Sequence, residues 1–449
     1  MSRFDAIFKA YDVRGTVPDQ FDDEMAGAIG AAFAAFVRSE DPSVSRVLVA
    51  RDMRPSGEGM VAAFSQGVVS QGLDVVDLGL GSTDLLYYAA GWMDAPGAMF
   101  TASHNPAQYN GIKFCLSGAR PVGEDSGLVQ IRDAAAAGVA PASEPGIVRH
   151  QDVLAEFAAH VRSFVDLESL RPLKVVADTA NGMGGLVVPA VFDALPFDLE
   201  VMYPELDGTF PNHPADPIQP ENQRDLMARV LEVGADVGLA FDGDADRVFL
   251  VDELGVGLSG STTTAILADA ILKQHPGGKV VHNLICSKAV PEVVVEAGGE
   301  PIRSRVGHSF IKQVMAETGA VFGGEHSAHY YFADNFRADS GLIAAVLVLE
   351  QLCIKGVPLS ELRKPYERYA ASGEINTVVP DPAEVIDRVA DVYAALPQDR
   401  LDGLTVDGGD WWFNLRPSNT EPLLRLNLEA ATPAEVDAKV AEVKAAFGL

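Results

Sequence analysis

One pattern occurs three times in the first 330 residues of this 449-residue chain: an apolar, β-branched run, a loop of small and polar residues, and then helical periodicity. Each occurrence contains two such runs, at 46–59 and 97–105, at 174–185 and 236–246, and at 279–288 and 320–329. Continuous apolar strands that alternate with helices are typical of parallel sheets covered on both faces. We therefore predict three similar α/β units. Ligands bind beyond the carboxyl ends of strands in such sheets, so we expect the chemistry in the loops after the second run of each unit.

The last part of the chain follows a different pattern. Residues 382–396 and 433–448 have helical periodicity, and two short strands are expected around 407–422, which together predict a smaller α+β domain. Breaks fall in the Ala/Pro/Gly-rich stretch 134–146, at the polar turn 252–255 and near 370–374. We expect four domains, with the boundaries 1–145, 146–253, 254–369 and 370–449.

The composition, 48% apolar and 22% charged, is that of a globular protein. The formal net charge of −29 argues against binding to nucleic acid or to an anionic membrane. The N-terminus has charges where a signal peptide would have its apolar core, and the apolar segment 342–354 is too short to span a bilayer. We expect that segment to be a buried helix. A cytoplasmic location is predicted, because three distant cysteines without a C-x-x-C pair indicate neither a zinc site nor a disulfide framework: Cys115, Cys286 and Cys353.

The segment "FTASHNP" at 100–106 places Ser103 next to His104, directly after an apolar run. A hydrolase nucleophile would be expected in a G-x-S-x-G turn, which is absent here. Neighbouring side chains of an extended stretch point apart, so His104 is expected to be badly placed as the base for Ser103. A helix cap is the structural alternative. The third interpretation is that Ser103 carries a phosphoryl group, with Lys113 near enough in the chain to bind or protonate there.

Three carboxylates stand at alternate positions in "FDGDADRVFLVDE" (241–253), namely Asp242, Asp244 and Asp246. They can converge on one hard cation, and Mg²⁺ is favoured because it tolerates few carboxylates completed by water or phosphate oxygens. A twelve-residue EF-hand loop begun at Asp242 would need glycine where Arg247 stands, and a β-type run follows at once. A solvated acidic turn is the structural alternative, but it would not need a strand on each side.

The segment "RPSNTEPLLR" at 416–425 has the composition of a phosphate-binding turn, with a guanidinium followed by small polar side chains. An ordinary turn between strands explains it equally well when it is taken alone. Other basic and polar groups gather locally against the acidic background of the chain. They are Tyr11 and Arg14 in "KAYDVRG" (9–15), and Arg305, His308 and Lys312 in "SRVGHSFIK" (304–312).

A third polar loop, "GGEHSAHYYF" at 323–332, contains Glu325, Ser327 and His329. Carboxylate, hydroxyl and imidazole groups bind polyol hydroxyls. A lone histidine is more often structural. The alternate spacing nevertheless predicts that all three side chains share one side of an extended segment.

Taken together and in this order, "KAYDVRG", "TASHNP", "DGDADR", "GEHSAH" and "RPSNTEP" resemble the signatures of the α-D-phosphohexomutase family, of the phosphomannomutase and phosphoglucomutase type. The resemblance extends over the whole chain. It implies a heart-shaped protein with a central active cleft. Three similar mixed-sheet α/β domains would be followed by a smaller α+β C-terminal domain.

The resemblance also implies roles for individual residues. Ser103 would be the phosphoserine and, with Asp242, Asp244 and Asp246, a Mg²⁺ ligand. Arg247 would contact the phosphoserine or the substrate, and Lys113 and His308 would be general acid/base groups on opposite sides of the cleft. A hexose 1,6-bisphosphate would be the intermediate and activator. The substrate contacts would be Tyr11, Arg14, His104, Lys288, Glu325, Ser327, His329, Arg416, Ser418, Asn419, Thr420 and Arg425.

The resemblance leaves the sugar open. Relatives specialised for glucosamine phosphate typically have Gln where this chain has His326 and Gly where it has Ala328, so glucosamine phosphate is disfavoured. We expect a phosphomannomutase, with phosphoglucomutase as the alternative main activity. A metal-dependent sugar phosphatase and a sensor that binds without chemistry are the alternatives from other classes. The expected partner is a hexose phosphate, and the chain is expected to be a monomer or a homodimer.

Overall fold

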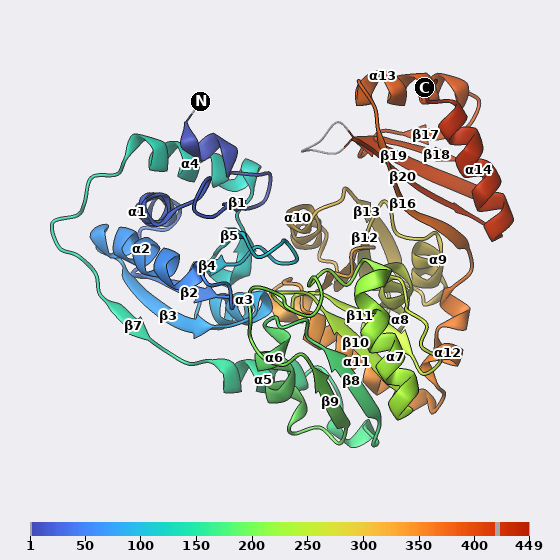
Figure 1. Cartoon of the computed structure of the whole chain (residues 1–449), viewed down its shortest axis with the longest axis horizontal. Coiled ribbons are helices and arrows are strands. Elements are labelled where there is room, and N and C mark those ends of the chain that lie inside the picture. Colours follow the sequence, from blue (N-terminus) through green and yellow to red (C-terminus); the bar gives the residue numbers. More distant parts are fainter. Residues whose placement is uncertain (1, 418–422, 449) are drawn as a thin grey trace. The chain divides into compact units, whose positions relative to one another are not determined.

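The computed structural model describes residues 2–417 and 423–448. The chain divides into two compact units, one of Met1–Ser259 with Ser327–Leu362 and the other of Gly260–His326 with Arg363–Leu449. Figure 1 shows the elements in chain order. Short 3-10 helices connect several of them: η1 (Arg3–Ala6), η2 (Ser117–Ala119), η3 (Glu124–Ser126), η4 (Leu167–Ser169), η5 (Pro220–Gln223), η6 (Ala333–Asn335) and η7 (Lys364–Tyr366).

The first sheet of the first unit has the strand order β1-β5-β4-β2-β3-β7, with the short β6 paired to β5. Strands β4, β2, β3 and β7 are parallel, whereas β5 runs antiparallel to both β4 and β1. The strands are β1 (Val13–Thr16), β2 (Arg46–Arg51), β3 (Asp74–Leu80), β4 (Gly97–Phe100), β5 (Tyr109–Leu116), β6 (Arg120–Pro121) and β7 (Val148–His150), and the helices are α1 (Asp23–Glu40), α2 (Gly57–Ser70), α3 (Thr83–Trp92) and α4 (Leu128–Ala137).

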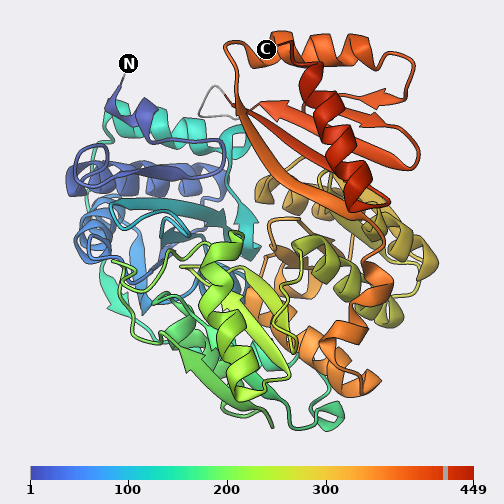
Figure 2. The same ribbon diagram turned by 45° about the vertical axis from the view of Figure 1, so that its right-hand side comes forward.

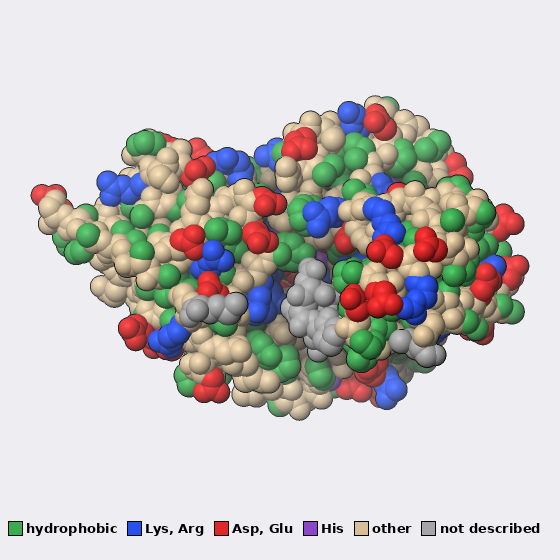
Figure 3. Space-filling view, turned by 90° about the horizontal axis from the view of Figure 1, so that it is seen from above, with side chains coloured by type: hydrophobic (Ala, Val, Ile, Leu, Met, Phe, Trp, Pro, Cys, Tyr) green, Lys and Arg blue, Asp and Glu red, His purple; other side chains and the backbone are tan. Residues whose placement is uncertain are grey.

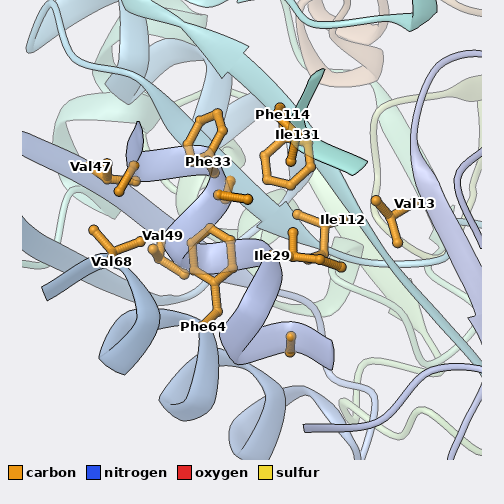
Figure 4. Close-up of a cluster of buried hydrophobic side chains, with 14 of the residues drawn as sticks. Val13, Ile29, Phe33, Val47, Val49, Phe64, Val68, Ile112, Phe114 and Ile131 are labelled. Atoms are coloured by element: carbon orange, nitrogen blue, oxygen red, sulfur yellow. The ribbon is translucent and has the colours of Figure 1, made fainter. Parts of the chain in front are cut away.

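The core of this region lies between the sheet and helices α1, α2 and α4 (Figure 4). Phe33 of α1 stacks on Phe114 of β5 with ring centroids 4.5 Å apart, and Phe64 of α2 meets Phe100 of β4 edge to face at 5.3 Å. Such ring pairs add about 0.5–1.5 kcal/mol each to the burial of their surface. The aromatic contacts therefore fix β4 and β5, the two strands that flank the Ser103 loop.

The second sheet of the first unit has the order β11-β10-β8-β9, parallel except for β11, which forms an antiparallel hairpin with β10. The apolar runs predicted parallel strands, but each sheet of this unit also contains antiparallel strands. This is because β4 leads into β5, and β10 leads into β11, without a helix between them. The strands are β8 (Lys174–Asp178), β9 (Asp198–Met202), β10 (Val237–Phe241) and β11 (Val248–Asp252), and the helices are α5 (Leu154–Arg162), α6 (Gly184–Phe192) and α7 (Arg224–Val233).

The chain returns to the first unit with β15 (Tyr330–Phe332), α11 (Gly341–Lys355) and α12 (Leu359–Leu362). The buried helix predicted at 342–354 is confirmed, since α11 is buried from its first residue to Cys353. In the described parts of the chain no single helix is both long and apolar enough to cross a membrane, although the bent pair Gly341–Lys355 and Leu359–Tyr366 passes by length and composition alone.

In the second unit, strands β13, β12 and β14 form a parallel arrangement in that order. Gly324, the last residue of β14, packs directly against α8: a Cβ there would lie 2.3 Å from Cγ2 of Thr264. The elements are α8 (Gly260–Gln274), β12 (Lys279–Asn283), α9 (Ala289–Glu296), β13 (Glu300–Ser304), α10 (His308–Thr318) and β14 (Phe322–Gly324).

The C-terminal part of the second unit is an antiparallel sheet of order β16-β20-β19-β18-β17 (Figure 2). Alternate residues of β18, β19 and β20 pack with α13 and α14 in one apolar core. The predicted α+β tail is therefore confirmed, and residues 370–374, where a domain break is predicted, form the beginning of β16. The elements are β16 (Ala370–Val378), α13 (Pro382–Val392), β17 (Gln398–Asp399), β18 (Leu404–Asp407), β19 (Trp411–Pro417), β20 (Leu423–Ala430) and α14 (Pro433–Ala445).

Charged side chains of both signs are interspersed on the face shown in Figure 3. This is the usual arrangement for a solvated surface. The 63 acidic residues outnumber the 34 basic residues, and both kinds are spread along the chain. In contrast, several carboxylates are completely buried, including Asp52, Asp84, Asp242 and Asp244. A buried carboxylate requires partners, and these partners define the candidate active site.

The contact between α1 and α2 provides a test of the fold. A Cβ at Gly30 would lie 2.1 Å from the carbonyl oxygen of Phe64, whereas a Cβ at Gly27, one turn earlier, would lie 3.4 Å from that of Ala63. We expect Gly30→Ala to lower the free energy of unfolding by about 1–3 kcal/mol through overpacking, and Gly27→Ala to raise it by up to about 1 kcal/mol through helix propensity. Thermal unfolding of both variants measures this. A melting temperature of Gly30→Ala equal to that of Gly27→Ala would contradict the packing.

Candidate active site

Ser103 lies in the loop that connects β4 with the antiparallel β5. Its side chain is buried, with the residue 5% exposed, and its backbone is left-handed with φ +50°. Its amide donates to Oγ1 of Thr101 at 2.9 Å. A left-handed conformation is uncommon for a residue with a Cβ and is often found at functional sites. The loop therefore presents the serine in a conformation that the surrounding structure must enforce.

Asp242, Asp244 and Asp246 lie in the connection between β10 and β11. The hairpin pairs Phe241 with Val248, so the whole acidic segment is a short turn closed by antiparallel strands. The expectation that it is not an EF-hand loop is confirmed, because β11 begins where that loop would still be turning. All three carboxylates are at most 1% exposed, and oxygens from each lie within 4.8 Å of one another. A solvated acidic turn is excluded by this burial.

The two loops meet at the Ser103 hydroxyl. Oγ donates a hydrogen bond to Oδ2 of Asp242 at 2.8 Å and accepts one from Nη2 of Arg247 at 3.3 Å. Arg247 also donates from Nε to Oδ2 of Asp242 at 2.9 Å. The hydroxyl is thus held between a carboxylate and a guanidinium, both from the turn between β10 and β11.

Lys113 of β5 supplies the second cation. Its Nζ donates to Oδ2 of Asp244 at 2.8 Å and to Oδ2 of Asp246 at 2.7 Å. Burial alone would lower the pKa of Lys113, but the two carboxylates outweigh it and raise this pKa well above its ordinary value. For Asp244, burial raises the pKa and Lys113 lowers it, and the net shift is downward. Lys113 is therefore protonated and Asp244 is ionised in this cluster.

The cluster fits a divalent cation. Two cations, Lys113 and Arg247, face three carboxylates. Burial and the charges of Asp244 and Asp246 raise the pKa of Asp242 well above its ordinary value although Arg247 opposes the shift, so the three carboxylates can all be ionised only when a further positive charge is present. Oδ1 of Asp244 and Oδ1 of Asp246 are buried and accept no hydrogen bond from any described residue. Orphaned carboxylate oxygens, in a cluster whose carboxylates outnumber its cations, are the kind of ligand that Mg²⁺ binds. The buried aspartates can therefore hold a metal ion.

His104 contacts Ser103, which is not what the sequence pattern predicted. Its Nδ1 lies 3.2 Å from Ser103 Oγ, because the left-handed backbone at Ser103 brings neighbouring side chains together where an extended strand would separate them. The same Nδ1 accepts a hydrogen bond from Nη2 of Arg247 at 2.7 Å. Burial, followed by the charge of Arg247, lowers the pKa of His104 well below its ordinary value. The imidazole is therefore neutral, and its Nδ1 lone pair is engaged by Arg247, so it is badly suited to be the base for the serine.

Arg14 reaches the serine loop from β1. Its Nη1 donates to Oδ1 of Asn105 at 2.6 Å, and its Nη2 is paired with Asp12. The antiparallel register places Arg14 opposite Gly111 of β5. Tyr11 is half-buried in the turn before β1. The structure thus joins Arg14 to the Ser103 loop by a hydrogen bond.

The segment that contains Glu325, Ser327 and His329 is not extended, contrary to the prediction. It turns at 326–327, and Ala328 is left-handed with φ +65°. Within the first unit, Ser327 Oγ lies 3.1 Å from Nδ1 of His329, and Nε2 of His329 lies 3.8 Å from Oδ1 of Asp246. The turn thus brings His329 to the aspartate cluster. Within the second unit, Glu325 is buried and accepts from Nδ2 of Asn283 and from the amide of Gly307, which precedes His308 at the start of α10.

Lys288 is engaged inside the second unit. Its Nζ donates to Oδ1 of Asp407 at 2.7 Å and to the carbonyl of Gly409 at 2.9 Å, and its amide donates to Oε2 of Glu429. All of its amine contacts in the described structure are therefore with the turn between β18 and β19. Its predicted contact with substrate stays a prediction.

Arg416 of β19 and Arg425 of β20 lie opposite each other in the antiparallel register. Both face one carboxylate, that of Glu374 on β16, with Arg416 Nη2 at 3.0 Å and Arg425 Nη1 at 3.7 Å. Two guanidinium groups side by side form a suitable anion site. The predicted residues Ser418, Asn419 and Thr420 lie outside the described residues.

Two residues of the site were missed by the sequence analysis. Thr83, the first residue of α3, donates from Oγ1 to Oδ2 of Asp244 at 2.6 Å and from its amide to the carbonyl of Asp244 at 3.0 Å. Arg54, three residues after the end of β2, donates to the carbonyl of Ser103 at 2.9 Å. Both follow the carboxyl end of a strand, β3 for Thr83 and β2 for Arg54, which was the available signal.

Most of the chain is matched by the models of one protein family. Its four parts are described as the phosphoglucomutase/phosphomannomutase alpha/beta/alpha domains I, II and III and the C-terminal domain, and they match residues 5–138, 155–255, 259–369 and 374–446. The chain belongs to the phosphoglucomutase/phosphomannomutase family, within the α-D-phosphohexomutases. It is an enzyme of the phosphohexomutase class, an intramolecular phosphotransferase, and the predicted fold class of three α/β domains and one α+β domain is confirmed.

Individual relatives agree with this assignment. The chain is 42% identical to a protein named "Phosphohexose mutases" from Xanthomonas campestris pv. campestris, and 39% identical to a phosphomannomutase from Escherichia coli (strain K12). Each alignment covers 94% of both chains. A crystal structure of a phosphoglucomutase/phosphomannomutase family protein from Burkholderia thailandensis has a TM-score of 0.90 at 31% identity and covers 99% of this chain and 98% of that one.

The charge balance of the cluster predicts a link between Lys113 and metal binding. We expect Lys113→Met to lower the melting temperature in EDTA, because removing one partner of a buried ion pair costs about 3–5 kcal/mol. Added Mg²⁺ should raise the melting temperature of this variant more than that of the parent, since the oxygens left by the amine can bind the ion. Lys273→Met, which removes an exposed pair with Asp269, is the control and should change stability by about 0–1 kcal/mol without dependence on Mg²⁺. Equal Mg²⁺ responses of Lys113→Met and the parent would contradict the interpretation.

Proposed function

We propose that this chain is a Mg²⁺-dependent phosphomannomutase, which interconverts mannose 1-phosphate and mannose 6-phosphate through a phosphorylated Ser103. The observation that carries the proposal is the buried hydroxyl of Ser103, 2.8 Å from Asp242 and within reach of Arg247. A hydrolase would need a base for that hydroxyl, but the Nδ1 lone pair of His104 is engaged by Arg247, and burial together with the charge of Arg247 lowers the pKa of His104, which makes it a weak base. A phosphoryl carrier needs charge stabilisation around the same oxygen, and this cluster supplies it.

The proposed reaction has two halves. In the first, a free hydroxyl of the sugar attacks phosphorus, the bond between phosphorus and Ser103 Oγ breaks, and a hexose 1,6-bisphosphate forms. In the second, Ser103 Oγ attacks the other phosphorus of this intermediate, the bond between that phosphorus and the sugar oxygen breaks, and the isomeric monophosphate is left. Asp242, Asp244 and Asp246 would hold Mg²⁺, which when bound supplies stabilisation of negative charge on the transferring group.

Proton transfer is assigned to two residues of this chain. Lys113 is protonated, because Asp244 and Asp246 hold its pKa above the ordinary value, so it is suited to supply a proton to Ser103 Oγ as the phosphoryl group leaves. His308, at the start of α10, is the group that would accept the proton of the attacking hydroxyl. Arg247 keeps its guanidinium on Ser103 Oγ throughout.

The remaining roles are proposals of the same kind. The sugar hydroxyls would be bound by Glu325, Ser327 and His329, and the phosphate that is not being transferred by Arg416 and Arg425 with Ser418, Asn419 and Thr420. Tyr11, Arg14, His104 and Lys288 would complete the substrate contacts. The boundaries 1–145, 146–253, 254–369 and 370–449, a monomeric or dimeric state and a cytoplasmic location also remain predictions.

An assay of three sugars tests the function. With Mg²⁺ and a trace of hexose 1,6-bisphosphate, we expect the purified protein to convert mannose 1-phosphate and glucose 1-phosphate to their 6-phosphates, and glucosamine 1-phosphate much more slowly. Coupled dehydrogenase assays measure each product, and released inorganic phosphate is measured in parallel. Phosphate release that outpaces isomerisation would establish a phosphatase instead. A higher kcat/KM for glucose than for mannose 1-phosphate would reverse the assigned preference.

The phosphorylation state of Ser103 tests the mechanism. Incubation with glucose 1,6-bisphosphate should add one phosphoryl group to the protein, detected by intact mass spectrometry and located on Ser103 by peptide mapping. Ser103→Ala should take up no phosphoryl group and lose mutase activity. Ser65→Ala, in which a buried hydroxyl of α2 without a described hydrogen-bond partner is removed, is the control and should behave like the parent. Mutase activity in Ser103→Ala would overturn the mechanism.

A further inference from the structure

Arg54 is the largest of the side chains that are completely buried in the described structure, with the residue 1% exposed. It stands three positions after the end of β2 and is paired with Asp52, whose Oδ2 accepts from Arg54 Nε at 3.1 Å and whose Oδ1 accepts from the Arg54 amide at 2.9 Å. Both side chains are inaccessible to solvent. Burial of a guanidinium away from solvent costs several kcal/mol of solvation free energy. The hydrogen bonds of Arg54 must compensate this cost.

The guanidinium uses all of its donors, and four of them bind the Ser103 loop. An arginine has five N–H donors in a planar fork, and one of them is taken by Asp52. Nη2 donates to the carbonyls of Ser103 at 2.9 Å and Asn105 at 2.7 Å, and Nη1 donates to those of Pro106 at 2.8 Å and Tyr109 at 2.9 Å. The loop between β4 and β5 is therefore wrapped around one cation, with its carbonyl groups directed inward.

This arrangement fixes the part of the loop that carries the hydroxyl. Ser103 has a left-handed backbone, and its carbonyl is bound by Arg54 on one side. On another side the turn between β10 and β11 approaches so closely that a Cβ at Gly243 would lie 2.5 Å from that carbonyl oxygen. With the carbonyl held in this way, Ser103 Oγ meets Asp242 at 2.8 Å.

Residues that follow β9 cover Arg54 from outside. The ring of Phe210 lies over the guanidinium, 5.2 Å from its carbon to the ring centroid, a distance at which a cation is attracted to the ring face. A Cβ at Gly208 would lie 2.6 Å from Cα of Arg54. Arg54 is thus packed between the serine loop of the first sheet and a loop of the second sheet within the same compact unit.

We propose that Arg54 is a positioning residue for phosphoryl transfer, which holds the Ser103 loop in the conformation that directs Oγ to Asp242 and makes no contact with the substrate. The proposal rests on the proposed function in one respect, the identity of Ser103 as the phosphoryl carrier. Lysine cannot replace this arginine, since an ammonium has three donors and no planar fork.

The test compares Arg54→Lys with Arg162→Lys. Arg162 of α5 also donates from Nη1 to main-chain carbonyls, those of Ala190 and Val191, but these lie in α6 and not in the site. For Arg54→Lys we expect kcat to fall about 100-fold, the effect of a misplacement of roughly 1 Å, while KM changes little because no substrate contact is lost. The rate at which glucose 1,6-bisphosphate phosphorylates Ser103 should fall in parallel. Arg162→Lys should retain both rates.

The outcomes separate this proposal from the proposed function. If the parent protein neither isomerises hexose phosphates nor accepts a phosphoryl group on Ser103, the proposed function fails. If the parent does both and Arg54→Lys, folded by circular dichroism, has the kcat and phosphorylation rate of Arg162→Lys, the positioning role of Arg54 is overturned. A large rise in KM at unchanged kcat would also overturn it, because it would place Arg54 in substrate binding.

A second variant covers the case in which Arg54→Lys does not fold. Phe210→Leu keeps an apolar side chain over the guanidinium but removes the attraction of the ring, so we expect a smaller fall in kcat and in the phosphorylation rate, again with little change in KM. Rates equal to those of the parent in both measurements would then count against the role of Arg54.

Discussion

The structure of the first unit depends on one requirement, the compensation of buried carboxylates. Asp242, Asp244 and Asp246 are at most 1% exposed, and an unpaired buried charge costs several kcal/mol. Their partners come from separate parts of the fold: Lys113 from β5, Thr83 from α3 and Arg247 from the acidic turn itself. The first and second sheets of this unit are therefore joined by charge, and the charge that remains uncompensated is the place for a cation.

Backbone contacts make this junction specific. The Ser103 carbonyl is bound by Arg54 and approached closely by Gly243, so neither the serine loop nor the aspartate loop can move without disturbing the other. Phe210 covers Arg54 from the second sheet. Side-chain charge thus determines what the site binds, whereas the main chain and one buried arginine determine where the hydroxyl lies.

The sequence was sufficient to locate Ser103 and the three aspartates, because each follows an apolar strand and the carboxyl ends of strands are where such loops lie. It was not sufficient for features that depend on backbone dihedral angles or on distant pairing. An apolar run does not give the direction of the strand that it forms, so the antiparallel directions of β5 and β11 did not follow from the residues themselves. The contact of His104 with Ser103 follows from a left-handed residue that the pattern does not encode. The pairing of Lys288 with Asp407 joins residues 119 positions apart.

The left-handed backbone at Ser103 restricts which amino acid could serve at this position as the proposed phosphoryl carrier. Threonine has the same hydroxyl, but its Cβ is branched, and a branched residue is a rare outlier at φ near +50°. Glycine and asparagine tolerate this backbone, but neither has a hydroxyl. Serine satisfies both conditions with the smallest side chain that bears one. The identity of the residue proposed as the carrier is therefore restricted by the conformation of the peptide chain as much as by the chemistry of the oxygen.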